Sequence, residues 1–184
     1  MLRHTLIFGA IAGIILMLLF ILEKPLWYQD AQHIDMKKGE ILGYISILIS
    51  LSMIFFGVRS YRDKHLDGSI TFGKAFKVGL MITLVASFIY VVGWIIYYNT
   101  SESMQNFPEL YLNYMLEDLK KSGSSAAEIA AKEAEFRYNM ELYKNPLFMI
   151  AITFLEIFPV GLLIDLISAF LLRKKALPKE GAQA

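Results

Sequence analysis

The chain has 184 residues, of which 56% are hydrophobic and 19% are charged, against about 25% charged residues in ordinary soluble domains. Its formal net charge of +1 is too small to indicate nucleic-acid binding, and the absence of cysteine excludes a disulfide framework, thiol catalysis and cysteine-ligated metal. The apolar residues gather in four runs, whereas a soluble core would distribute them at helix or strand periods.

The four apolar runs predict transmembrane helices at about 5–22, 41–58, 75–98 and 147–172. Each run can cross about 30 Å of hydrocarbon at about 1.5 Å per residue. We expect helices because an isolated strand would leave backbone groups without partners in lipid. The first run is interpreted as an uncleaved anchor rather than a signal peptide, because Glu23, Lys24 and Pro25 follow it without a small-residue cleavage site.

The connection after the second run resembles a nucleotide-binding motif only superficially. Residues 68–74 have the glycine and lysine spacing of a phosphate-binding loop, but Ala75 stands where that loop needs Ser or Thr, and no buried strand precedes it. We therefore expect an ordinary turn, with Phe72 and Phe76 dipping into the membrane interface and Lys74 meeting lipid phosphate.

The segment between the third and fourth runs predicts a helical hairpin at about 107–143. Pro108 suits a first helical position, Gly123 suits a stop, and Ser125 with Glu128 forms a capping box for a second helix. One apolar stripe at helical spacing is the candidate partner surface: Phe107, Leu110, Tyr111 and Tyr114. The alternative is a merely solvated loop.

The distribution of basic residues predicts the orientation. Nine Lys or Arg lie in the N-terminus, the second connection and the tail at 173–184, whereas residues 99–146 carry five against eight acids. Because basic residues favour the cytoplasmic side, both termini are predicted to be cytoplasmic and the hairpin external.

Two acids interrupt the fourth run. Glu156 and Asp165 lie on opposite sides of Pro159, about 180° apart around the helix, so they are expected to face different neighbours. A carboxyl at this depth costs about 2.5–3.5 kcal/mol on insertion scales. Pro159 removes one backbone hydrogen bond and is expected to kink the helix beside Glu156.

Two interpretations of this candidate intramembrane polar site are open. The favoured one is an interhelical hydrogen bond from Glu156 to Ser, Thr or Tyr on a neighbouring helix. The other is an ion or proton site that uses Glu156 and Asp165. Lys77, one turn inside the third run, is expected to extend to the headgroups, and its alternative is a pair with Asp165.

Little in the sequence indicates catalysis. His4, His33 and His65 lack ligand spacing, and the serines of the runs lack a histidine partner, so we expect no catalytic residue, metal or cofactor. Gly9 and Gly13 form a GxxxG pair, which is interpreted as helix packing within the bundle or between copies.

Three stretches, at 72–80, 143–146 and 153–162, resemble an uncharacterised family of bacterial membrane proteins, domain of unknown function 4199. The resemblance covers most of the chain, from the first run to Arg173. It implies a small inner-membrane protein without an established activity, so no catalytic residue can be carried over.

The expected fold is an all-α membrane protein with four transmembrane helices and an extramembrane helical hairpin between the third and the fourth. The leading hypothesis is a non-enzymatic accessory or assembly subunit that sits in the lipid bilayer and presents its outer loop to a membrane or periplasmic protein, or to a second copy. The alternative is a small ion- or proton-coupled transporter or channel using Glu156 and Asp165. A transporter needs polar groups from several helices, whereas a scaffold needs exposed apolar surface on the hairpin.

Overall fold

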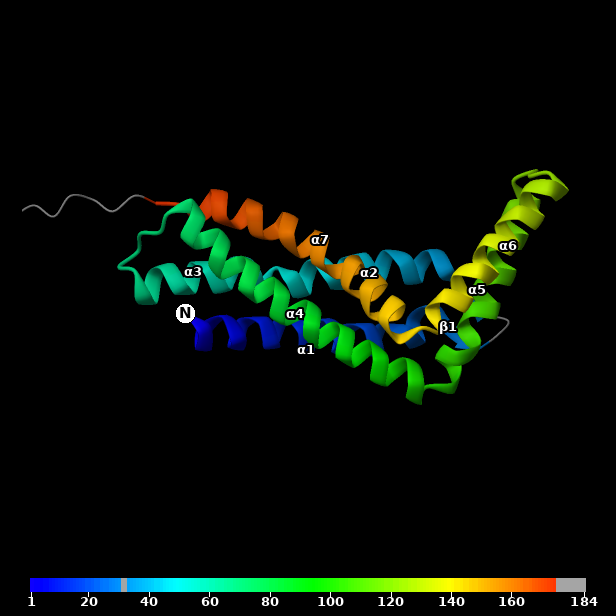
Figure 1. Cartoon of the computed structure of the whole chain (residues 1–184), viewed down its shortest axis with the longest axis horizontal. Coiled ribbons are helices and arrows are strands. Elements are labelled where there is room, and N and C mark those ends of the chain that lie inside the picture. The colour runs from blue at the N-terminus through cyan, green and yellow to red at the C-terminus, as the bar shows by residue number, and fades with distance from the viewer. Residues whose placement is uncertain (31–32, 175–184) are drawn as a thin grey trace, which may run out of the picture.

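The computed structural model describes residues 1–30 and 33–174 and is built almost entirely of helices (Figure 1). Four spans are long and apolar enough to cross a membrane: α1 (Leu2–Trp27), α2 with α3 (Met36–Leu51 and Met53–His65), α4 (Phe72–Thr100) and α7 (Pro146–Leu172). Between α4 and α7 lie the two helices of the hairpin, α5 (Glu102–Lys121) and α6 (Ala126–Tyr143). The predicted all-α membrane fold is confirmed.

The bundle is elongated and its two ends differ (Figure 1). The N-terminus, the turn between α3 and α4, and the last turn of α7 lie at one end, which we call the termini end. At the other end, the hairpin end, α5 and α6 run side by side and project away from the bundle axis. The hairpin therefore extends beyond the ends of the four spans, as expected for an extramembrane element.

Helix α4 packs against both α1 and α7, and glycines on α1 allow the close approach of one pair. A Cβ atom added at Gly9 would lie 2.6 Å from Cβ of Val85, and one at Gly13 would lie 2.8 Å from Cβ of Ile89. Real side-chain atoms do not approach so closely, since carbon atoms prefer separations of about 3.5–4.0 Å. The GxxxG pair is therefore used for packing inside the bundle.

Two features of the first half differ from expectation. The second span is interrupted at Ser52, whose hydroxyl donates to the carbonyl of Ile49 at 2.6 Å and so competes with the regular helix hydrogen bonds. Between α1 and α2 the chain forms two short antiparallel strands, β1 (Tyr28–Asp30) and β2 (His33–Ile34). These strands were not predicted from the sequence.

The hairpin confirms one predicted cap and corrects a predicted start. The capping box is present, with the Ser125 amide donating to Glu128 at 2.8 Å, and Gly123 turns the chain at a φ of +81°. Pro108, however, lies inside α5, which already begins at Glu102. The earlier start buries Met104 on the face that also buries Leu112, and this packing overrides the local preference of proline. Of the predicted tail at 173–184, the structure describes residues 173 and 174. The other residues, 175–184, lie outside the described part of the chain.

Candidate functional site

Helices α4 and α7 meet along a face that carries small and polar residues, which we call the α4–α7 seam: Gly79, Thr83, Ser87, Gly161 and Asp165. A Cβ atom at Gly79 would lie 2.6 Å from Cγ of Asp165 and would overlap its carboxylate. A Cβ atom at Gly161 would lie 2.5 Å from Cγ2 of Thr83. Asp165 on α7 and Thr83 on α4 are therefore each seated against a glycine of the other helix.

Hydrogen bonding along the seam is incomplete. The Thr83 hydroxyl donates to the carbonyl of Gly79 at 3.0 Å and lies 3.5 Å from the carbonyl of Gly161. The Ser87 hydroxyl and both carboxylate oxygens of Asp165 are buried without a hydrogen-bond partner in the part of the chain that the structure describes. Asp165 is 0% exposed, so it is the most costly polar group of the seam.

The structure does not bring the other predicted site residues to Asp165. Lys77 is exposed, and no ion pair joins it to Asp165 among the described residues, so that alternative is not formed. Pro159 is also exposed, and α7 runs through it without interruption. Glu156 lies nine residues before Asp165, which is about 13 Å along the helix. The two carboxylates therefore do not form one site.

Glu156 is exposed on the surface of the bundle rather than buried between helices. Within residues 1–30 and 33–174 its carboxylate makes no side-chain hydrogen bond, so the favoured interhelical bond is not found. Its carboxylate nevertheless lies near the hydroxyl group of Tyr143 at the end of α6. Glu156 therefore lies at the edge of a polar cluster near the hairpin end.

Tyr143 connects this cluster to the base of the hairpin. The indole N–H of Trp94 on α4 donates to the Tyr143 hydroxyl at 2.6 Å. Burial is the main effect on the pKa of Tyr143 and raises it, and the nearby Glu156 carboxylate raises it further. Hydrogen bonds with the Thr153 hydroxyl and the Trp94 N–H lower this pKa, but they offset only part of the rise. The Tyr143 hydroxyl therefore keeps its proton at neutral pH and can act as a donor.

A third intramembrane acid, Glu23, was missed by the sequence analysis. The predicted first span ended at residue 22, but α1 continues through Pro25 to Trp27, and Glu23 is only 7% exposed. Its carboxylate accepts a hydrogen bond from the Ser46 hydroxyl on α2 at 2.6 Å. Trp27, an aromatic residue of the kind that marks membrane interfaces, was the available signal that the helix extends past Glu23.

An apolar groove of about 220 Å³ lies at the base of the hairpin. Helices α4, α5 and α6 line it, with side chains that include Trp94, Phe107, Tyr111, Phe136 and Met140. The ring of Tyr111 stacks on that of Phe136, with centroids 5.9 Å apart, so the walls of the groove support each other. The groove is preformed by packing within the hairpin and against α4.

Two of the four predicted partner-surface residues line this groove, namely Phe107 and Tyr111. Leu110 is half-buried, and Tyr114 is 41% exposed. Part of the predicted partner surface therefore packs against the rest of the chain, and part of it is exposed.

No group of three His, Cys, Asp or Glu side chains in the described ranges is arranged to hold a metal ion. The family described as "Protein of unknown function (DUF4199)" matches residues 7–174, which include most of α1, all of α2–α7 and the seam. No curated protein and no solved structure matches the chain. Because the family match extends over far more than half of the sequence, the chain belongs to the DUF4199 family.

Proposed function

We propose that this protein is a non-enzymatic membrane protein that uses the base of its hairpin to bind another membrane protein. The observation that supports the proposal is the apolar groove, which the described chain leaves open. Tyr143 lines it at the end of α6 and Trp94 lines it in the last two turns of α4, and aromatic residues of this kind are typical of the membrane interface. The segment of the partner that would fit this apolar groove is itself apolar and lies next to one of the partner's transmembrane helices.

Contacts between α5 and α6 also hold the two helices of the hairpin together. Arg137 on α6 pairs with Glu109 on α5 at 3.2 Å and with Glu133 at 3.1 Å, and the aromatic stack beneath this pair joins the same helices. A preformed surface loses less conformational entropy on binding than a loop that must first become ordered. The proposal rests on this combination of an open apolar groove and a fixed frame.

Site-specific photocrosslinking in native membranes tests the proposal. A photoreactive residue replacing Met140, which lines the groove, should give a discrete protein adduct. The same probe replacing Tyr138, which is 66% exposed on α6 and is not a groove residue, is the control and should give none. Tyr111→Ala should remove the Met140 adduct. Lipid adducts alone, or identical adducts from both positions, would contradict a protein occupant.

We also propose a second function, proton or cation binding at Asp165, because its buried carboxylate lacks a partner among the described residues. Seam residues from two helices surround it, but Glu156 lies on a different face of α7. Proton or cation flux into reconstituted vesicles should then require Asp165 and should be lost in Asp165→Asn. Flux that survives in Asp165→Asn, or that is absent from the wild type, would exclude this function.

A further inference from the structure

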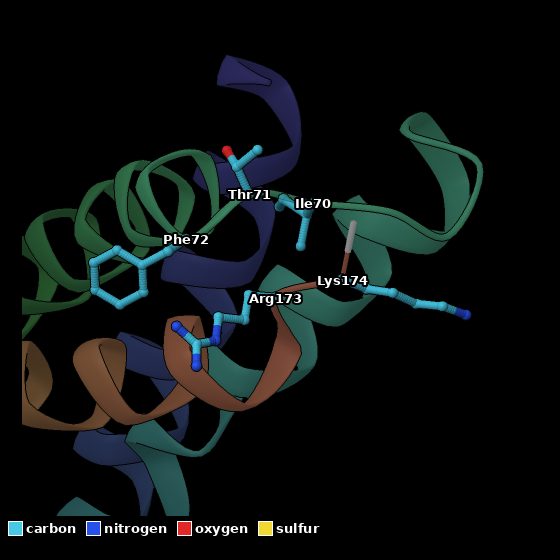
Figure 2. A pocket seen from close by; sticks show the side chains of 5 residues that line it. All are labelled: Ile70, Thr71, Phe72, Arg173 and Lys174. Carbon is cyan, nitrogen blue, oxygen red and sulfur yellow. The ribbon is translucent and has the colours of Figure 1, made fainter. Parts of the chain in front are cut away.

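The termini end contains a larger pocket, of about 490 Å³, between the start of α4 and the end of α7. Its lining residues come from the turn before α4 and from the segment after α7: Ile70, Thr71, Phe72, Arg173 and Lys174 (Figure 2). The pocket lies where two spans end, so in a membrane it is at the level of the lipid headgroups.

Backbone contacts fix the two walls of this pocket relative to each other. Ile70 and Lys174 exchange two backbone hydrogen bonds, of 3.0 and 2.9 Å, and Ile70 is only 3% exposed. The Arg62 side chain donates to the carbonyl of Leu172 at 3.3 Å and holds the last turn of α7. The position of Arg173 between these two points is therefore set before any ligand binds.

The pocket carries the positive charges of Arg173 and Lys174. Among residues 1–30 and 33–174, no carboxylate forms an ion pair with Arg173 or Lys174. Asp63, an acid at the same end, is already paired with Arg62 at 2.7 Å and lies 3.8 Å from Arg59. The guanidinium of Arg173 is therefore available for an anionic ligand.

The lining combines a hydroxyl donor, Thr71, with one aromatic ring, Phe72, and a second ring, that of Phe170, contacts Arg173. The Thr71 oxygen accepts from the backbone amide of Lys74 at 3.4 Å, which leaves the hydroxyl proton free to donate. In Figure 2 the Arg173 guanidinium lies on the same side as the Phe72 ring, whereas Lys174 extends away from it. Arg173 also stacks over the ring of Phe170, 4.2 Å from its centroid. Phe72 and Phe170 are 39% and 55% exposed, so both present apolar surface beside the cation.

We propose that this pocket binds a phosphate group, carried by an anionic phospholipid of the adjacent leaflet. A guanidinium can donate two parallel N–H hydrogen bonds to two oxygens of one phosphate group, and the Thr71 hydroxyl supplies a further hydrogen-bond donor. Free phosphate offers the same anionic chemistry. The exposed rings of Phe72 and Phe170 favour the lipid, because they offer apolar contact for acyl chains below the phosphate. This site is independent of the hairpin groove and of Asp165.

Native mass spectrometry of the full chain in detergent tests the proposal. The protein is titrated separately with phosphatidylglycerol, with phosphatidylcholine of the same acyl chains, and with inorganic phosphate. We expect phosphatidylglycerol to bind most tightly and Arg173→Gln to weaken it about tenfold, as loss of a charged hydrogen bond predicts. Arg173→Lys keeps the charge but loses the planar fork, so it should weaken binding less than Arg173→Gln.

The matched control is Arg59→Gln on α3, which removes the same charge but does not alter the pocket lining. It should change the affinity less than about twofold. An equal loss in Arg59→Gln would show general electrostatic attraction, and equal binding of both lipids would show that the negative charge of the lipid is not recognised. Either result would overturn the proposal. Binding of inorganic phosphate that depends on Arg173 and equals that of the lipid would uphold the phosphate chemistry and overturn the lipid as its source. Circular dichroism verifies that each variant is folded.

Discussion

The contact between Gly79 and Asp165 makes the seam sensitive to a single methyl group. In Gly79→Ala the new Cβ would lie 2.6 Å from Cγ of Asp165, about 1 Å inside the optimal separation of about 3.5–4.0 Å between carbon atoms. The carboxylate cannot easily rotate away, because Asp165 is 0% exposed and its side chain is short. Helices α4 and α7 must therefore separate, or the Asp165 side chain must leave its rotamer.

Overpacking of this kind costs typically about 1–3 kcal/mol, and we expect about 3 kcal/mol here because both backbones are held in long packed helices. The matched control is Gly73→Ala on the same helix, since nothing lies within 4 Å of a Cβ added there. Alanine is the better helix former by about 1 kcal/mol, so the control should be neutral or slightly stabilising.

Unfolding of the purified protein in mixed detergent, followed by circular dichroism, measures the free energies of the variants. The double variant Gly79→Ala/Asp165→Ala removes the clash, and we expect a coupling energy of about 2 kcal/mol between the two positions. If Gly79→Ala unfolds at the same denaturant concentration as Gly73→Ala, or if the two seam substitutions are simply additive, the described contact does not determine the packing of the seam.

Three further predictions concern the termini, Glu156 and the hairpin cap. Reporter fusions after Leu66 should be cytoplasmic and a fusion after Ser124 external, because basic residues concentrate at the termini end; the reverse pattern would invert the proposed topology. Glu156→Gln should change the free energy of unfolding by less than about 1 kcal/mol, and Glu156→Leu should stabilise the protein, because the exposed carboxyl makes no hydrogen bond within the described residues. If Glu156→Leu instead destabilises the protein, the Glu156 carboxyl has a hydrogen-bond partner that this reasoning missed. Backbone and hydroxyl hydrogen bonds from Ser125 lower the pKa of Glu128, so its contribution to the hairpin is present above the unfolded pKa and is lost as pH falls through the folded value. Hydrogen exchange of the α6 amides should therefore show an acid-induced loss of protection that Glu128→Gln reduces, and equal loss in both proteins would count against the cap.

The spans were predictable because a membrane helix needs a long apolar run, and such runs are visible without any knowledge of packing. The hairpin was predictable at Ser125, where the capping box depends only on residues three positions apart. The start of α5 was not, because the local preference of Pro108 competes with burial of Met104 against the rest of the chain. That burial depends on contacts between segments distant in sequence.

The candidate site was predictable only as a set of residue types. Asp165 was noticed because a carboxylate is rare in an apolar run, but its contact with Gly79 depends on how α4 and α7 cross. Glu23 was missed because charged residues next to a run usually mark its end. The pocket at Arg173 joins two segments about 100 residues apart, and the pairing of Ile70 with Lys174 has no local signature.

The hydrogen bonds of the seam separate the residues that helix packing explains from Asp165, which helix packing does not explain. Gly79 and Gly161 allow the helices to approach, and the Thr83 hydroxyl is satisfied by the Gly79 carbonyl at 3.0 Å. These residues account for the packing without any need for a carboxylate. Asp165 occupies the same interface at a cost of several kcal/mol, and no side chain or backbone group in the described chain repays it. Asp165 is therefore the residue of this buried interface that we propose binds a proton or a cation.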